Sequence, residues 1–297
     1  MLLYFFPKPF AIYLPYPQTF KTMIMRNKIL MLFTVATVTF TSCTKDENTS
    51  QPLSSADMIA EARIDAAIDD ISILVENQYL TQEAEAKRQA APASLLPPCA
   101  VVTVDRTFTS WTRTVDFGVT GCEMANGTVF RGKIIMHFDT DFDTLNTTIS
   151  YSFDNFYHND DLIVGDKTMT RVSENANGNP ETRFEIDMHI TFANGSEYDR
   201  QGVRVREFAE GHDTWNFSDD VHVITGSSTT IFPDGSVDSS EITTPIRRAF
   251  ACRYTSEGVV ELHRNSDVAI IDFGNGDCDN IALLTINGTT REIRLLF

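Results

Sequence analysis

Apolar and polar side chains alternate along most of the chain from residue 99 onward. In the segments 149–153 and 184–192 every second residue is apolar, as with Phe184, Ile186 and Met188. A period of two is typical of strands that bury one face. Asn-Gly or Asp-Gly pairs recur between such segments and supply the positive φ angles that tight hairpins need. The pattern predicts about a dozen sequential strands in an antiparallel meander, forming either a β-sandwich or a curved open sheet.

Ahead of this region the apolar period becomes that of a helix. Four residues carry it: Ile64, Ile68, Ile71 and Val75. Ser54, three residues before Asp57, forms a capping-box signature. We therefore expect one amphipathic helix from about residue 56 to 79, within a helical leader over 56–98. The opposite face carries Glu61, Asp65, Asp69 and Asp70, and we expect it to point into water while the apolar face lies on the sheet.

The N-terminal region has the layout of an export signal. An uncharged run, Ile29–Phe40, follows Arg26 and Lys28. A basic start and a short apolar core are typical of a secretory signal peptide, whereas a membrane-spanning helix needs about 20 apolar residues. We predict a signal peptide over 23–42. Residues 1–22 are interrupted by prolines that would break any helix, and we expect translation to start after them.

Cys43 follows the small residues that end this signal, which resembles the lipobox of bacterial lipoproteins in the looser form found in Bacteroidota. Lys45, Asp46 and Glu47 resemble the Lys-then-acids signal that sends such lipoproteins across the outer membrane. The resemblance implies a lipid anchor on Cys43, passage through the lipoprotein export machinery and exposure at the cell surface. Residues 43–55 are then a tether that buries nothing. The alternative is an ordinary thiol behind a cleaved secretory signal.

The chain is acidic, with a net charge of −17, and the first 42 residues contribute only basic charges. Such a charge repels phosphate backbones and anionic lipid surfaces, so nucleic acid is not expected as a partner. Solubility at an exposed surface explains the charge equally well.

The remaining cysteines form an even set: Cys99, Cys122, Cys252 and Cys278. No Cys-x-x-Cys motif is present, which argues against a zinc ribbon or a thioredoxin-like site. Asp-Phe-Gly precedes the second and the fourth cysteine at the same offset, which suggests two related end units over about 99–139 and 252–297. We predict the disulfides Cys99–Cys122 and Cys252–Cys278. A chance match of short hairpin phrases is the alternative, and pairing across the units would require the two Asp-Phe-Gly loops to touch.

Several phrases, namely Asp-Phe-Gly before a cysteine, "RGKI", "FDNFYHND" and "GDCDN", resemble those of a largely uncharacterised group of Bacteroidota surface lipoproteins. The resemblance covers most of residues 95–297. It implies a fold and a location, and it implies no activity.

Catalytic motifs are missing from the sequence: there is no Gly-x-Ser-x-Gly, phosphate loop, dinucleotide motif or His-Glu-x-x-His. One acidic loop holds Asp272, Asn275, Asp277 and Asp279, which could offer oxygen ligands to calcium. Aspartates that cap turn amides explain it as well. Asp187 and His189 share a strand face and could begin a metal site.

Aromatic residues could stack on sugar rings, although in a β protein most belong to the core; the candidates are Trp111, Tyr151, Tyr157, Tyr198 and Trp215. We therefore expect a surface lipoprotein with a non-catalytic β domain that binds a glycan or protein ligand or has a structural role at the outer membrane. The alternative is a glycan-binding or glycan-processing accessory lipoprotein. No cofactor other than calcium is expected.

Overall fold

The computed structural model describes residues 52–139, 146–214, 217–252 and 254–295, all within one unit, Asn48–Phe297. The signal peptide, Cys43, Lys45, Asp46 and Glu47 lie outside the described residues, as does Trp215.

Fifteen antiparallel strands form a single open sheet, so the curved open sheet is the correct alternative. The strands are β1 (Val101–Arg106), β2 (Ser110–Asp116), β3 (Cys122–Glu123), β4 (Val129–Asp139), β5 (Asn146–His158), β6 (Asp161–Val164), β7 (Lys167–Val172), β8 (Glu181–Thr191), β9 (Glu197–Glu210), β10 (Val221–Ile231), β11 (Val237–Ala249), β12 (Glu257–Arg264), β13 (Asp267–Asn275), β14 (Ile281–Ile286) and β15 (Thr289–Arg294). Most of them follow one another in sequence order, as a meander requires. β3 pairs with β4 alone, and β6 and β7 share one position between β5 and β8.

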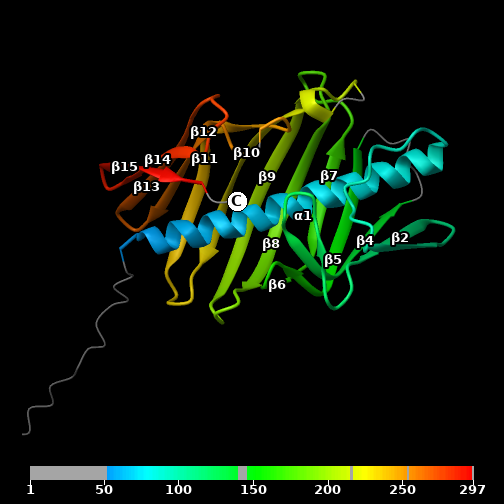
Figure 1. The fold of residues 1–297 in the computed structure, drawn as a ribbon, viewed down its shortest axis with the longest axis horizontal. Coiled ribbons are helices and arrows are strands. Elements are labelled where there is room, and N and C mark those ends of the chain that lie inside the picture. The colour runs from blue at the N-terminus through cyan, green and yellow to red at the C-terminus, as the bar shows by residue number, and fades with distance from the viewer. Residues whose placement is uncertain (1–51, 140–145, 215–216, 253, 296–297) are drawn as a thin grey trace, which may run out of the picture. The chain divides into compact units, whose positions relative to one another are not determined.

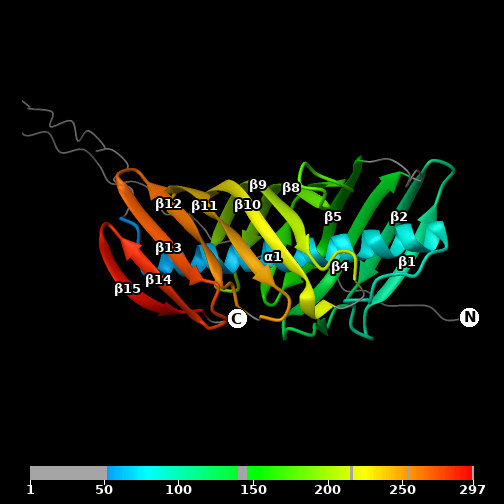
Figure 2. The ribbon, with the colours of Figure 1, turned by 90° about the horizontal axis from the view of Figure 1, so that it is seen from above.

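The only α-helix of the described residues, α1 (Ser55–Lys87), runs across one face of the sheet, which curls around it (Figures 1 and 2). A 3-10 turn, η1 (Phe217–Asp219), precedes β10. The predicted capping box is present: Ser54 accepts a hydrogen bond from the Asp57 amide at 3.3 Å, and the Asp57 carboxylate accepts one from the Ser54 amide at 2.8 Å. The helix ends where Arg88 adopts a left-handed conformation, with φ 55°. No helix in the described part of the chain is long and apolar enough to cross a membrane.

Bulges produce the curvature. The β4–β5 register shifts between Arg131 and Lys133, around Gly132, whose φ is 84°. A Cβ at Gly132 would lie 2.0 Å from the carbonyl oxygen of Asn155, so no other residue fits this crossing. Further register shifts occur in β10–β11, β11–β12 and β12–β13. Because each bulge bends its strand and increases the twist, together they let the sheet wrap the helix.

The hydrophobic core lies between α1 and the inner face of the sheet. Ile64, Ile71 and Val75 of the helix pack into it and are almost fully buried. A second, smaller cluster near the N-terminal end of the helix includes Leu53, which is 6% exposed and whose amide donates to Asp267 at 3.0 Å. The prediction that the tether buries nothing is therefore wrong for its last residues, because Leu53 anchors the start of the helix to β13.

The acidic face of α1 points to the sheet and is only partly exposed, contrary to the sequence expectation. Glu61 is 3% exposed and pairs with Arg200 of β9, which is itself 1% exposed. Asp65 accepts from Arg200 at 2.6 Å and from Arg204 at 3.1 Å, and Asp69 accepts from Arg204 at 2.8 Å. The face was misassigned because its partners are buried arginines more than a hundred residues away.

We call this set of helix carboxylates and sheet arginines the arginine seam. It continues along the helix in both directions: Glu76 pairs with Arg206, and Asp57 in the first turn pairs with Arg264. Burial raises the pKa of Glu61 above its usual value despite the opposing effect of Arg200. Burial also tends to raise the pKa of Asp65, but Arg204 and Arg200 together lower it below its usual value. The seam therefore holds the helix through ion pairs that are partly or fully removed from solvent.

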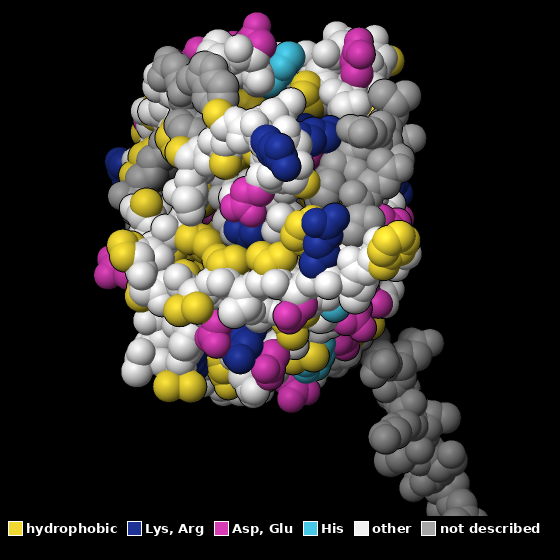
Figure 3. All heavy atoms as spheres, turned by 90° about the vertical axis from the view of Figure 1, so that its right-hand side faces the viewer, with side chains coloured by type: hydrophobic (Ala, Val, Ile, Leu, Met, Phe, Trp, Pro, Cys, Tyr) yellow, Lys and Arg dark blue, Asp and Glu magenta, His cyan; other side chains and the backbone are white. Residues whose placement is uncertain are grey.

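The two predicted disulfides are present, with Cα–Cα distances of 5.9 Å for Cys99–Cys122 and 5.7 Å for Cys252–Cys278. The end units containing them lie at opposite ends of the strand order. They share a local turn, because the carboxylates of Asp116 and Asp272 each accept from a glycine amide two residues later, at 2.8 and 2.9 Å. Figure 3 views the end that carries β1 and β2.

Candidate functional site

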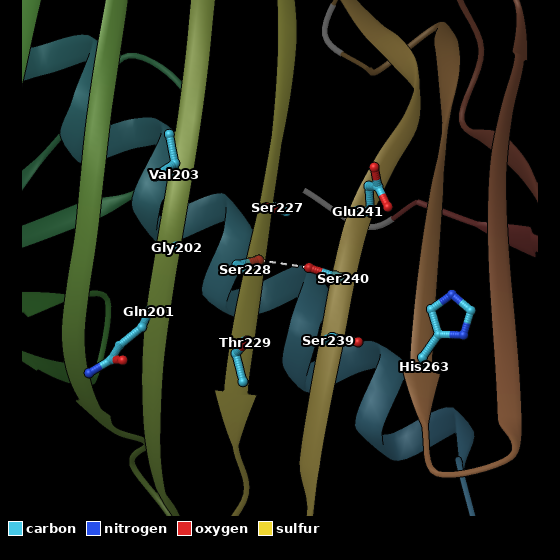
Figure 4. A pocket seen from close by; sticks show the side chains of 10 residues that line it. All are labelled: Gln201, Gly202, Val203, Ser227, Ser228, Thr229, Ser239, Ser240, Glu241 and His263. Atoms are coloured by element: carbon cyan, nitrogen blue, oxygen red, sulfur yellow. Dashed lines mark hydrogen bonds between the residues drawn. The ribbon is translucent and has the colours of Figure 1, made fainter.

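The outer face of the sheet, opposite α1, carries a hollow of about 410 Å³ near its centre (Figure 4). Strands β9, β10, β11 and β12 line it. The lining residues are Gln201, Gly202, Val203, Ser227, Ser228, Thr229, Ser239, Ser240, Glu241 and His263. Six of these are exposed polar side chains, so the hollow is open to solvent and can offer hydrogen bonds to a ligand.

A second hollow of about 460 Å³ adjoins the first and shares Gln201, Gly202 and Val203 with it. Its other lining residues come from β8 and from the start of β7: Asp166, Thr168, Glu185, Ile186 and Asp187. Since the two hollows share β9 as a wall, we treat them as one outer trough.

The period of two along each strand orients the trough side chains. On β9, Arg200 and Arg204 point inward to the arginine seam, so Gln201 and Val203 between them point outward. Gly202 lets β9 and β10 approach closely, because a Cβ there would lie 2.4 Å from the Ser227 carbonyl oxygen. Beneath the trough, Ser228 and Ser240 share a hydrogen bond of 2.7 Å that ties β10 to β11 (Figure 4).

Many polar groups of the trough have no partner within the described residues. Thr229, Ser239 and Glu241 make no side-chain hydrogen bond or ion pair there, whereas Gln201 makes only a long one, 3.4 Å, to Asp187. Unpaired hydroxyls and carboxylates on an open surface bind water or a polar ligand at little desolvation cost. The trough is therefore chemically suited to recognising hydroxyl-rich or cationic groups.

Two arrangements in the trough bear on catalysis. Ser239 lies opposite His263 in the β11–β12 register, and His263 Nε2 lies 2.9 Å from Glu261. The three residue types of a serine nucleophile site thus share a patch, but no hydrogen bond joins Ser239 to His263 in the described structure. An activated serine needs that bond to its base. The hydroxyl is therefore not activated in this geometry.

The second arrangement is a pair of carboxylates. Glu241 and Glu261 lie directly opposite each other on adjacent strands, on the outer face. Two carboxyl groups flanking a glycosidic bond are the minimal requirement of most glycosidases. Like charges in directly opposed positions also destabilise a sheet, so the pair is not explained by stability.

Lys167 lies on the inner side of β7, behind the second hollow. It is 3% exposed, and its ammonium group donates to the backbone carbonyl of Asp187. Burial lowers the pKa of Lys167 to about 7, and the charges of Asp187 and Asp166 oppose this only in part. A buried lysine with such a pKa is neutral in a large fraction of molecules near neutral pH.

The other residues singled out in the sequence have local partners. In the acidic loop, Asp272 accepts from the Gly274 amide and Asp279 accepts from the Ile281 amide at 2.8 Å. These are the turn contacts that the sequence left as the alternative to calcium. No group of three or more His, Cys, Asp or Glu side chains within the described ranges is arranged to hold a metal ion. Calcium binding there remains a prediction.

His189 pairs with Asp199 at 2.8 Å. Of the aromatic candidates, Tyr151 and Tyr198 are buried in the core. Trp111 and Tyr157 each carry an arginine over the ring, at 4.6 and 3.9 Å. None of these four lines the outer trough.

The sequence analysis did not single out Gln201, Thr229 or Glu241. Alternation places them on the polar face of their strands, but it does not show which part of that face is hollow. The positions of Arg200, Arg204 and Arg206 differ by even numbers, which places all three on one face of β9, and this was a usable signal for the arginine seam. No family model, curated protein or solved structure matches this chain.

Proposed function

We propose that this chain is a cell-surface lipoprotein whose β domain is non-catalytic and binds a polar ligand in the outer trough. The observation that carries the proposal is the set of unpaired hydroxyl and carboxylate groups, such as Thr229, Ser239 and Glu241, along an open depression that no described segment fills. The missing catalytic motifs and the unbonded Ser239 support a binding role over turnover. A glycan offers the density of hydroxyl groups that such a surface can bind.

A binding assay tests this proposal. The full chain is screened on a glycan array, and the ligands found are titrated against Val203→Arg, which places a long side chain in the trough. We expect Val203→Arg to weaken binding at least tenfold, because it blocks the wall shared by both hollows. Leu283→Arg is the matched control, since Leu283 is a 45% exposed residue of β14 outside the trough. Equal affinities for both variants would place the binding site elsewhere.

The location rests on the residues around Cys43 and on their likeness to Bacteroidota surface lipoproteins. We expect Cys43→Ala to abolish labelling by palmitate. Replacing Lys45, Asp46 and Glu47 together by alanine should leave the lipid and remove accessibility to protease on intact cells. Undiminished cleavage after the triple change would refute the export signal, and continued labelling after Cys43→Ala would refute the anchor.

The opposed carboxylates favour one second candidate, a glycan-processing role. If Glu241 and Glu261 act as acid and base or nucleophile, a panel of glycosidase substrates will show turnover. Glu241→Gln and Glu261→Gln must then each abolish it while leaving the fold intact by circular dichroism. Turnover that both variants remove would replace the binding proposal, and a silent panel would leave binding as the function of the trough.

A further inference from the structure

The edge strand β1 is an open hydrogen-bonding edge with an apolar character. Within the described residues β1 pairs only with β2, so alternate amides and carbonyls on its other side have no strand partner. Three of its six residues are valines, and Val101 and Val104 are 59% and 38% exposed. On the end face that includes β1, hydrophobic side chains gather in a band with charged groups around it (Figure 3).

The opposite edge of the sheet differs in chemistry. β15 carries three charged residues among six, Arg291, Glu292 and Arg294. Charged side chains on an edge strand discourage pairing with another chain. β1 carries one acid and one base next to each other, at its C-terminal end. Of the two edges, β1 is the one left open to pairing.

We propose that β1 pairs with β1 of a second copy of this chain, so that one sheet runs through a two-fold symmetric dimer. A two-fold axis perpendicular to the sheet makes the two edge strands antiparallel, which continues the pattern of every strand pair in the sheet. A head-to-tail contact cannot do this. The strand order has thirteen antiparallel positions, so β1 and β15 run in the same direction and would have to pair in parallel.

The sequence of β1 selects the register. Directly opposed residues must share a face of the sheet. The residue at the two-fold axis therefore lies opposite the same residue of the second copy. With Thr103 at the axis, Val102 of each copy lies opposite Val104 of the other copy. Centring on Asp105 would oppose two carboxylates, and centring on Val104 would oppose both Asp105 and Arg106 to uncharged residues. Centring on Thr103 does so within β1 only for Asp105, which faces Val101, whereas centring on Val102 would pair only residues 101–103 of the strand. The register centred on Thr103 is therefore favoured.

Strand pairing ends before Phe108, because the Thr107 amide donates to the Ser110 carbonyl at 2.9 Å and closes the turn that carries Phe108. Within β1, Val102 and Val104 each face the other valine of the second copy, so the strand is complementary to itself. This self-complementarity identifies the partner as a second copy rather than an unrelated peptide.

The test uses the full chain carrying Cys43→Ala. Without the lipid the chain does not associate with micelles, whose mass would obscure that of the protein. Sedimentation velocity should show a dimer for this chain. Thr103→Lys, which opposes two ammonium groups at the axis, should convert it to a monomer. Thr290→Lys is the matched control, an exposed threonine on the other edge strand, and should leave the dimer intact. The proposal would be overturned if the chain carrying Cys43→Ala alone is a monomer, or if the chain that also carries Thr103→Lys is still a dimer.

A cysteine pair tests the register independently of repulsion. Thr103→Cys should form an intermolecular disulfide under mild oxidation, because the two residues face each other at about 5 Å. Asp105→Cys should not, because each cysteine then lies two residues from the axis and the two cysteines are four residues apart along the strand pair. Cross-linking of Asp105→Cys and not of Thr103→Cys would exclude the register, and failure of both would exclude the β1 contact.

Discussion

Arg200→Ala is expected to lower the free energy of unfolding by about 3–5 kcal/mol, the range for removing one partner of a buried ion pair. Arg200 is 1% exposed and bonds to Glu61, Asp65 and Thr230. Its removal leaves the Glu61 carboxylate buried beside a neutral side chain, and Asp65 keeps only Arg204. Guanidinium denaturation monitored by circular dichroism measures the change.

Two comparisons make the result specific to the seam. Arg183→Ala removes a 48% exposed arginine whose one ion pair among the described residues, to Glu185, is 3.9 Å long, and it should change stability by less than about 0.5 kcal/mol. Replacing Arg200 by Met and Glu61 by Leu together should recover much of the loss, because an apolar pair needs no compensation for buried charge. If Arg200→Ala is as mild as Arg183→Ala, the seam does not hold the helix.

Lys167→Met is expected to remove a pH dependence of stability. The pKa of Lys167 is about 7 in the folded chain, whereas the ordinary pKa of a lysine side chain is 10.5. Between pH 7 and pH 10.5 Lys167 therefore carries a proton in the unfolded chain that it has lost in the folded chain. The free energy of unfolding should therefore rise with pH across this window, by up to about 1.4 kcal/mol per unit. Below pH 7 Lys167 is charged in both states, and the cost of burying its ammonium group lowers the free energy of unfolding by its full amount.

Urea denaturation at pH 7, 8 and 9 measures this slope. Lys167→Met should show a flatter profile and should gain stability over the wild type most strongly at pH 7. Lys133→Met is the matched control, because Lys133 is 42% exposed on β4 and should retain the wild-type profile. Parallel profiles for Lys167→Met and the wild type would show that Lys167 titrates normally.

The local pattern of the sequence was sufficient for much of the fold. Alternation over 184–192 predicts β8, and the helical spacing from Ile64 to Val75 predicts α1. The repeated Asp-Phe-Gly predicts both disulfides, which the structure confirms. These features depend on neighbours within about 30 residues, where spacing alone carries the information.

Long-range features could not be read in this way. The spacing of Glu61 and Asp65 is that of a solvated helix face, and only the inward position of Arg200 makes it a buried one. Whether the sheet closes into a sandwich or stays open depends on bulges such as that at Gly132, whose φ is a property of the strand crossing. The outer trough likewise arises where β9 and β10 approach at Gly202.

The arginine seam also sets an order of events during folding. α1 is made first, yet its partners Arg200 and Arg264 lie 139 and 207 residues later in the chain. Contacts of such separation carry the full cost of loop closure before they contribute any stability, and they slow folding. The seam therefore cannot close until β9 and β12 exist, although other helix residues, such as Asp70 with His158 of β5, can pair with strands made earlier. Until then Glu61 and Asp57 keep their hydration, and the closing of the seam is a late step of folding.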